Sequence, residues 1–444
     1  MPNRLLFYFD VRSESWSREV AELRIWQEEA LAAWESNDRR GIIAAATGTG
    51  KTRLALEALK RVADGNGRAV VVVPTRVLQD QWIRELRGAR IVPARRIGTV
   101  GGTDPDPNPD HLIIVAVIDS ARTGVRSLIK HWNGLGFPTM LVVDECHWAG
   151  SDYNKGVFEG DAKWRLGLSA TPERGDDGFD DVLLPQLGGI VYRYSLKDAM
   201  DDGVLADLQL VNLILDLTRG EVDEYERIEQ RINALSSELS RKRPDLFVNR
   251  DWTTAVALAA KGEPLAKRLS AFVAERRRML ARTSGRFVAV KNLLEFGHFN
   301  GRRTIVFNET IDQAEHVADL VRDGGISVAV DHSKMSQRDR EANQARFRGG
   351  GADCFVVVKA ADEGLDVPDA DQALITSGTL NPRQRIQRLG RVVRLGGLRP
   401  RAISLLARGT TEEEVVAGRD LELLGISRVR TVAAANSDLP SLWG

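Results

Sequence analysis

Residues 42–52 read IIAAATGTGKT: an apolar run, then a turn rich in glycine and threonine, then Lys51-Thr52. The apolar run predicts a buried strand, and the residues after the turn predict a helix. A turn of small residues lets backbone N–H groups wrap a phosphate, and the helix N-terminus adds positive potential. We therefore expect a nucleotide here, with Lys51 at its β- and γ-phosphates and Thr52 on Mg²⁺. The residues expected to hold it are Thr47, Gly48, Thr49, Gly50, Lys51 and Thr52.

A second apolar run, residues 140–143, is followed directly by Asp144 and Glu145. The run predicts a strand, and ligands of open α/β sheets bind at the carboxyl ends of such strands. Asp144 is suited to hold Mg²⁺, and Glu145 to orient or deprotonate an attacking water. His147 is placed to couple this site to its neighbours. The two stretches together predict hydrolysis of a nucleoside triphosphate.

Strand-like apolar runs alternate with helical patterns on both sides of these motifs, which is typical of α/β domains. Unbroken apolar runs indicate parallel sheets that are buried on both faces. The alternation stops between residues 217 and 286, where the sequence is charged and helix-like. The strand-like runs are residues 42–45, 69–73, 112–118, 140–143 and 166–168, and later 304–307, 327–330, 355–358, 373–376 and 402–406.

The composition indicates a globular protein of the cytoplasm. The 444 residues are 43% hydrophobic, with 62 basic and 62 acidic side chains. No apolar run approaches the ~18–20 residues that span a bilayer, and the N-terminus lacks the apolar core of a secretory signal. Two cysteines, Cys146 and Cys354, cannot form a disulfide framework, which fits a reducing compartment. We expect Cys146 to be a small buried residue.

Positive charge is concentrated in the central stretch although the whole chain is neutral. Residues 241–291 hold thirteen basic and four acidic side chains. One interpretation is a basic helix that follows a phosphate backbone through Arg276, Arg277 and Arg278, with Arg282 and Arg286 nearby. The other is an ordinary solvated helix face. A helical apolar stripe in the same stretch comprises Leu265, Leu269, Phe272, Met279 and Leu280.

The order of further motifs resembles that of the DEAD/DEAH-box-type helicases of superfamily 2, with the variant box DECH at residues 144–147. Residues 23–27 (LRIWQ) resemble the Q motif, which implies that Gln27 reads adenine. Residues 73–76 (VPTR) resemble motif Ia, which implies that Thr75 and Arg76 contact a nucleic-acid backbone. Ser120 lies where a further backbone-contacting motif falls. Trp26 and Trp82, in or just after these motifs, are candidates for base contact or for the core.

The later motifs continue the resemblance to residue 394. Residues 169–172 (SATP) resemble motif III, which implies that Ser169 and Thr171, with His147, couple hydrolysis to strand binding. Residues 304–310 resemble motif IV, which places Asn308 at the nucleic acid. Residues 363–368 (EGLDVP) resemble motif V, with Gly364 and Asp366 at the nucleotide. Residues 387–394 (QRLGRVVR) resemble motif VI. The resemblance assigns the chemistry to Lys51, Asp144, Glu145, Gln387, Arg391 and Arg394.

The resemblance implies an α/β fold of two tandem RecA-like parallel-sheet domains with a helical thumb-like insertion between them. We expect the first domain at residues 1–210, the basic insertion at 211–286, the second domain at 287–425 and a tail at 426–444. Residues 169–177, and the position of the insertion, resemble the XPB/UvsW-like branch of DNA helicases. Restriction-type helicase subunits share much of this pattern.

The implied function is an ATP-dependent DNA helicase or translocase, active in repair, recombination or defence. ATP and Mg²⁺ would bind in the cleft between the two domains, where arginines of motif VI stabilise the charge of the transferred phosphate. DNA would bind largely through its phosphates, and a partner protein would select the target. Two alternatives remain: an RNA helicase, and an ATP-gated helicase-like subunit of a larger restriction, defence or repair complex.

Overall fold

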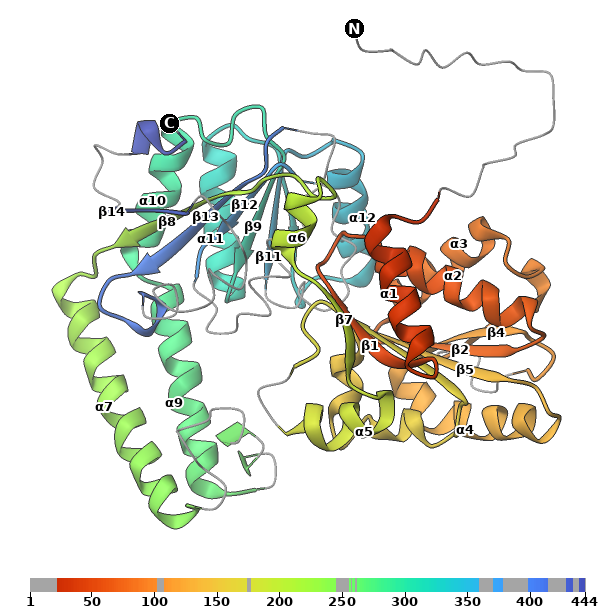
Figure 1. The fold of residues 1–444 in the computed structure, drawn as a ribbon. Helices are drawn as coiled ribbons and strands as arrows, with labels where there is room; N and C mark the ends of the chain where they lie inside the picture. The colour runs from red at the N-terminus through yellow and green to blue at the C-terminus, as the bar shows by residue number, and fades with distance from the viewer. Residues whose placement is uncertain are drawn as a thin grey trace, which may run out of the picture.

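The computed structural model describes residues 22–101, 108–173, 177–244, 255–256, 258–259, 262–358, 370–377, 398–413, 429–433 and 439–443. Two parallel sheets of seven strands each organise the described residues (Figure 1). Almost every strand residue of the first sheet's centre is buried, because helices cover both faces. The expected α/β class is confirmed.

The first sheet has the strand order β3-β4-β2-β5-β6-β1-β7. Its strands are β1 (Arg40–Ala45), β2 (Arg68–Val73), β3 (Ile97–Val100), β4 (Ile113–Val117), β5 (Thr139–Asp144), β6 (Trp164–Ser169) and β7 (Ile190–Tyr194). Parallel pairing brings the carboxyl ends of all seven strands to one edge. The turn at residues 46–50, Thr75 and Asp144 therefore lie along the same edge.

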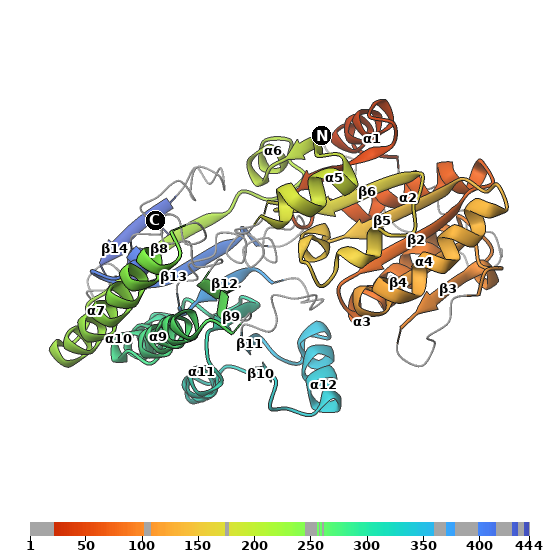
Figure 2. The same cartoon turned by 90° about the horizontal axis from the view of Figure 1, so that it is seen from below.

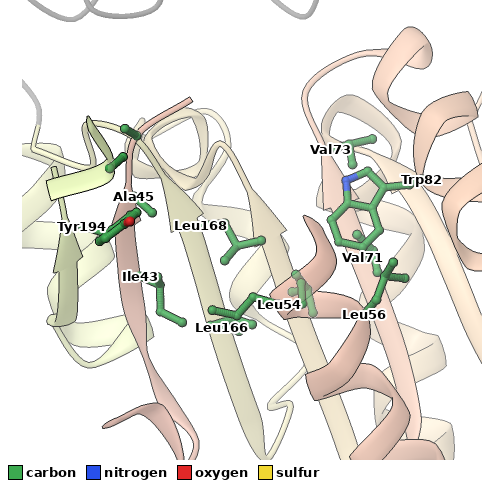
Figure 3. Packing of buried hydrophobic residues seen from close by; sticks show 14 of the residues in the cluster. Ile43, Ala45, Leu54, Leu56, Val71, Val73, Trp82, Leu166, Leu168 and Tyr194 are labelled. Atoms are coloured by element: carbon green, nitrogen blue, oxygen red, sulfur yellow. The ribbon is translucent and has the colours of Figure 1, made fainter. Parts of the chain in front are cut away.

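Helices cover the two faces of this sheet separately. One face packs against α1 (Ile25–Ser36), α2 (Lys51–Asp64) and α3 (Arg76–Ala89). The other packs against α4 (Ile118–Gly134), the short helices η2 (Cys146–Gly150), η3 (Lys155–Phe158) and η4 (Phe179–Leu183), and α5 (Leu184–Leu187). Figure 3 shows the first of these cores, in which Leu166 and Leu54 lie between Ile43 and Val71. Cys146 is buried in the second, as expected.

The second sheet has the strand order β10-β11-β9-β12-β13-β8-β14, again all parallel. Its strands are β8 (Gln209–Leu215), β9 (Thr304–Asn308), β10 (Val328–Asp331), β11 (Cys354–Val358), β12 (Gln372–Ile375), β13 (Arg401–Ala407) and β14 (Val429–Ala433). One face packs against α10 (Ser284–Glu295) and α11 (Ile311–Asp323). On the other face, α12 (Gln337–Arg348) lies beside β10 (Figure 2). Helix α6 (Leu196–Asp201) lies between the two sheets in the chain.

Two segments differ from what the sequence led us to expect. The range 211–286, expected to be entirely an insertion, begins with most of β8, which pairs with β13 and β14. The range 426–444, expected to be a tail, supplies β14 and two buried side chains, Leu439 and Leu442. Both segments complete the second sheet because their apolar residues are buried there. The division of the chain into domains stays a prediction.

Helices α7 (Arg219–Lys242) and α9 (Pro264–Ala281) lie side by side and extend away from the second sheet (Figure 1). α7 begins in a capping box, in which Thr218 and Glu221 satisfy backbone N–H groups reciprocally. Its apolar face meets the predicted apolar stripe of α9 in a separate small core. In the described parts of the chain, no helix is long and apolar enough to cross a membrane.

Candidate nucleotide site and nucleic-acid interface

The turn between β1 and α2 has the backbone that a phosphate cradle requires. Gly48 and Gly50 have φ angles of +84° and +102°, which side-chain-bearing residues rarely adopt. A Cβ atom on Gly50 would also lie 2.8 Å from the amide nitrogen of Gln27. The turn therefore needs glycine at Gly50, and it opens directly into the N-terminus of a fourteen-residue helix.

Lys51 lies inside this turn. Its ammonium donates hydrogen bonds to the carbonyls of Ala45, at 2.8 Å, and Ala46, at 3.3 Å. The Thr47 hydroxyl oxygen is buried and has no hydrogen-bond partner in the described structure, whereas the Thr49 hydroxyl donates to Ala46 at 2.7 Å. An ammonium and an unpaired hydroxyl beside exposed turn backbone fit a bound phosphate chain.

The candidate Q motif braces this turn from α1. Arg24 donates from Nη1 to the Thr49 carbonyl at 2.7 Å, and Gln27 donates from Nε2 to the Gly50 carbonyl at 3.0 Å. The other amide atom of Gln27 accepts from the Arg24 backbone at 2.9 Å. The structure thus shows how Gln27 contacts the phosphate turn, while adenine reading stays a prediction. Sequence reasoning missed Arg24, which carries no pattern of its own.

The tryptophans near these motifs are core residues. Trp26 is 3% exposed and stacks on Tyr194 with ring centroids 4.5 Å apart. Trp82 is 1% exposed, and its ring lies in the core near Val71 and Val73 (Figure 3). Neither presents a ring face to solvent, so the structure supports the interpretation of both as core residues.

Asp144 ends β5 at the same sheet edge as the phosphate turn. Its Oδ2 accepts from the indole N–H of Trp82 at 2.8 Å, and its Oδ1 accepts from the Glu145 backbone at 3.0 Å. Burial raises the pKa of Asp144, while the hydrogen bond from Trp82 and the charge of Lys51 oppose that rise. A carboxylate at the edge that also holds the phosphate turn suits Mg²⁺, which prefers oxygen ligands.

Glu145, His147 and motif III form one chain of contacts. His147 Nδ1 lies 3.5 Å from Glu145 Oε2 and 3.1 Å from the Ser169 hydroxyl. The Ser169 hydroxyl also accepts from the Thr171 backbone N–H at 3.1 Å. Glu145 has a left-handed backbone, with φ +47°, which turns the chain sharply after β5. The structure brings these four residues together, and their coupling role stays a prediction.

The predicted nucleic-acid contacts of the first sheet share its carboxyl edge. Thr75 follows β2 and caps α3, accepting from the Leu78 backbone at 3.4 Å, and Arg76 is exposed. Ser120 lies in the first turn of α4, directly after β4. Because β2 and β4 are neighbours in the sheet, these residues lie along one stretch of its edge.

Burial corrects two predicted nucleic-acid contacts, Asn308 and Arg276, and also removes the nearby Arg286 from the exposed surface. Asn308 is fully buried, and its amide bonds to Val306, Val357 and Thr376 inside the second sheet. Arg276 is 3% exposed and forms an ion pair with Glu229 of α7. Arg286 is fully buried and pairs with Glu412. Arg277 and Arg278 are exposed, as a nucleic-acid contact requires.

The remaining predicted site residues lie outside the described residues. These are Gly364 and Asp366 of the motif V stretch and Gln387, Arg391 and Arg394 of the motif VI stretch. In the sequence, Gly364 and Asp366 fall between the end of β11 at Val358 and the start of β12 at Gln372.

Comparison with known proteins identifies the family. Residues 21–174 match the family described as type III restriction enzyme, res subunit, and residues 285–396 match the helicase conserved C-terminal domain. A relative named DNA 3'-5' translocase XPB2, from Sulfurisphaera tokodaii, is 30% identical over 398 residues, covering 89% of this chain and 84% of its own. The chain belongs to the XPB branch of superfamily 2 helicases.

Other relatives of this helicase are longer. The putative DNA 3'-5' helicase Rad25 of Halobacterium salinarum is 26% identical, over 94% of this chain and 60% of its own. The DNA 3'-5' helicase XPB of Mycobacterium tuberculosis is 24% identical, over 85% of this chain and 60% of its own. This chain thus spans about three fifths of these two relatives.

Solved structures show the same fold. The helicase domain of Pyrococcus furiosus Hef matches 89% of this chain and 97% of its own, with a TM-score of 0.52 and 18% identity. Yeast Dbp5 bound to RNA and ADP BeF3 matches 95% and 93%, with a TM-score of 0.59 and 13% identity. At this identity the likeness concerns the fold alone, and it confirms the expected pair of RecA-like domains.

Proposed function

We propose that this helicase is a DNA-dependent ATPase that moves along DNA in the 3'-5' direction. The match to XPB2 over 89% of the chain carries this proposal, because it spans both sheets and the helical pair between them. The phosphate turn and the Asp144–Glu145 pair at one sheet edge support the ATPase part. By contrast, the ATP-dependent rRNA helicase rrp3 of Sclerotinia sclerotiorum matches 22% of this chain.

Different side chains at the edge of the first sheet are proposed to bind ATP and to hydrolyse it. Lys51 neutralises the β- and γ-phosphates, and Gln27 braces the turn below them. Asp144 and Thr52 are the proposed protein ligands of Mg²⁺, which when bound would neutralise phosphate charge. Glu145 orients the attacking water and accepts its proton. Arg391 and Arg394 are proposed to stabilise the transferred phosphate from the second domain.

DNA is proposed to bind along exposed basic and hydroxyl side chains of the first sheet's edge and of α9. Thr75, Arg76 and Ser120 would hold one strand at the edge of the first sheet. Arg277 and Arg278 on α9 would contact phosphates from the helical pair α7–α9. The chain of contacts from Glu145 through His147 and Ser169 to Thr171 is proposed to couple ATP hydrolysis to DNA binding.

Replacing Arg277 and Arg278 by alanine together is expected to weaken DNA binding without sequence preference. Each lost phosphate contact lowers the slope of log affinity against log salt by about 0.9, so the double variant should lose about one to two units of slope. Binding titrations at several salt concentrations measure it. The matched control is Lys291→Ala with Arg322→Ala, which removes the same charge from exposed sites on α10 and α11. Equal losses in both doubles would contradict the proposed contact.

Arg276→Ala is expected to act on stability instead. It leaves the partly buried Glu229 carboxylate without its partner, and breaking such a buried pair costs about 3–5 kcal/mol. Backbone hydrogen exchange in α7 and α9 should become faster by the corresponding amount. Arg277→Ala, at an exposed site, should change the opening free energy derived from exchange by less than about 0.5 kcal/mol. An unchanged exchange rate in Arg276→Ala would show that the ion pair contributes nothing.

Strand displacement tests the direction of movement. Duplexes carrying a single-stranded tail of either polarity are incubated with ATP and the full chain. We expect displacement from the 3'-tailed DNA substrate and little from the 5'-tailed one. Preference for the 5' tail would reject the 3'-5' assignment, and Lys51→Ala serves as the inactive control.

A further inference from the structure

The indole of Trp82 crosses the first core and ends at the nucleotide site. Its ring packs near Val71, Val73 and Leu56, and its nitrogen points toward the carboxyl end of the strands (Figure 3). There the N–H donates to Asp144 Oδ2 at 2.8 Å, while the Glu145 backbone donates to Oδ1 at 3.0 Å. Because each carboxylate oxygen accepts from a different N–H group, the two hydrogen bonds together set the plane of the carboxylate.

This arrangement is more than core packing. The Trp82 N–H is fully desolvated, at 1% exposure of the residue, and it meets a side-chain carboxylate rather than a backbone carbonyl. Hydrogen bonds to an ionised acceptor are stronger and more directional than neutral ones. The hydrogen bond from Trp82 therefore favours the ionised carboxylate of Asp144 in one orientation.

Trp82 also belongs to the helix that begins at the predicted DNA contacts. Thr75 caps α3, and Arg76 is its first residue. One turn later the buried Gln79 donates to the carbonyls of Val100 and Val115, at 3.1 Å and 2.8 Å, and so fixes α3 on β3 and β4. Trp82 follows within the next turn and reaches β5. One helix thus spans from the DNA edge to the carboxylate.

We propose that Trp82 is a positioning residue of the nucleotide site. Its indole N–H fixes the orientation of the Asp144 carboxylate. Through α3, that orientation is coupled to the predicted DNA contacts Thr75 and Arg76. This inference rests on the proposed function, because it takes Asp144 as the protein's Mg²⁺ ligand. Losing a group that orients a metal ligand typically costs 10–100-fold in metal affinity.

The variant Trp82→Phe removes the N–H, and Trp34→Phe is its matched control. Trp34 is also 1% exposed and also donates its indole N–H, at 2.9 Å, but to the backbone carbonyl of Arg165. Both variants lose the same atoms from the same domain. A second variant carries 3-benzothienylalanine at position 82, which keeps the bicyclic ring and lacks only the N–H.

The measurement is Mn²⁺ binding to the full chain with a non-hydrolysable ATP analogue, followed by electron paramagnetic resonance, with and without a single-stranded DNA oligomer. We expect both Trp82 variants to bind Mn²⁺ about 10-fold more weakly than the wild type. Affinity for fluorescent ADP in EDTA, and the melting temperature, should match those of Trp34→Phe. DNA should change the Mn²⁺ affinity of the wild type, and at least half of that change should disappear in the Trp82 variants.

Three results would contradict separate parts of the proposal. Mn²⁺ affinity in the Trp82 variants equal to that in Trp34→Phe would overturn the positioning role. If the Trp82 variants bind Mn²⁺ more weakly but DNA changes their Mn²⁺ affinity as much as in the wild type, α3 does not couple DNA binding to Asp144. A wild-type chain with no nucleotide-dependent Mn²⁺ site would instead overturn the proposed function itself.

Discussion

Lys51→Ala is expected to lower kcat for ATP by about 10³-fold, since removing a single preorganised donor to developing charge has effects of this size. The ammonium sits within the turn, held by the Ala45 and Ala46 carbonyls, so alanine leaves no cation to meet the β- and γ-phosphates. The turn itself keeps its shape, because Gly48 and Gly50 set its backbone. Steady-state ATPase assays in saturating DNA measure the loss.

Lys60→Ala is the control for this variant. Lys60 lies on the same helix α2 and is exposed, so its removal changes net charge equally without touching the turn. We expect its ATPase rate to stay near that of the wild type. A Lys51→Ala protein that keeps more than about a tenth of the rate would remove Lys51 from the catalytic set.

Glu145→Gln is expected to retain ATP binding and to lower the hydrolysis rate by about 10²–10⁴-fold, the usual contribution of a general base. Glutamine has nearly the shape of glutamate and can keep the contact with His147, but it cannot accept the proton of the attacking water. Single-turnover hydrolysis separates this step from product release. Equilibrium binding of labelled ATP should stay within a few-fold of the wild-type value.

Glu159→Gln provides the matching control, because Glu159 is an exposed partner of Arg126 at 2.7 Å and lies away from the sheet edge. Its hydrolysis rate should not change. Normal hydrolysis by Glu145→Gln would mean that another group activates the water. Loss of ATP binding in the same variant would mean that Glu145 holds the nucleotide rather than the water.

Local sequence patterns predicted the parts of the site that local backbone builds. The run 42–52 predicted β1, the phosphate turn and α2, and the run before Asp144 predicted β5. Each depends on residues a few positions apart, so sequence periodicity and small turn residues suffice. The parallel order of the strands then brought Thr75 and Ser120 to the same edge.

The errors came from partners that are distant in sequence. Arg276 and Arg286 belong to a basic run, but their ion-pair partners Glu229 and Glu412 are 47 and 126 residues away. The side chain of Asn308 likewise accepts a hydrogen bond from Thr376, which lies 68 residues later in the chain. A charge run is therefore a poor guide to which arginine faces solvent, because burial depends on the packed fold. The bond from Trp82 to Asp144 was missed for the same reason.

The steady-state ATPase rate decides whether this helicase is driven by DNA. It is measured with no polymer, with single-stranded DNA, with forked DNA and with RNA of matched sequence, in one buffer at one salt concentration. For a DNA-dependent ATPase we expect strong stimulation by DNA, less by RNA, and loss of the stimulated rate in Lys51→Ala. Stimulation by RNA alone, or by none of the polymers, would contradict it.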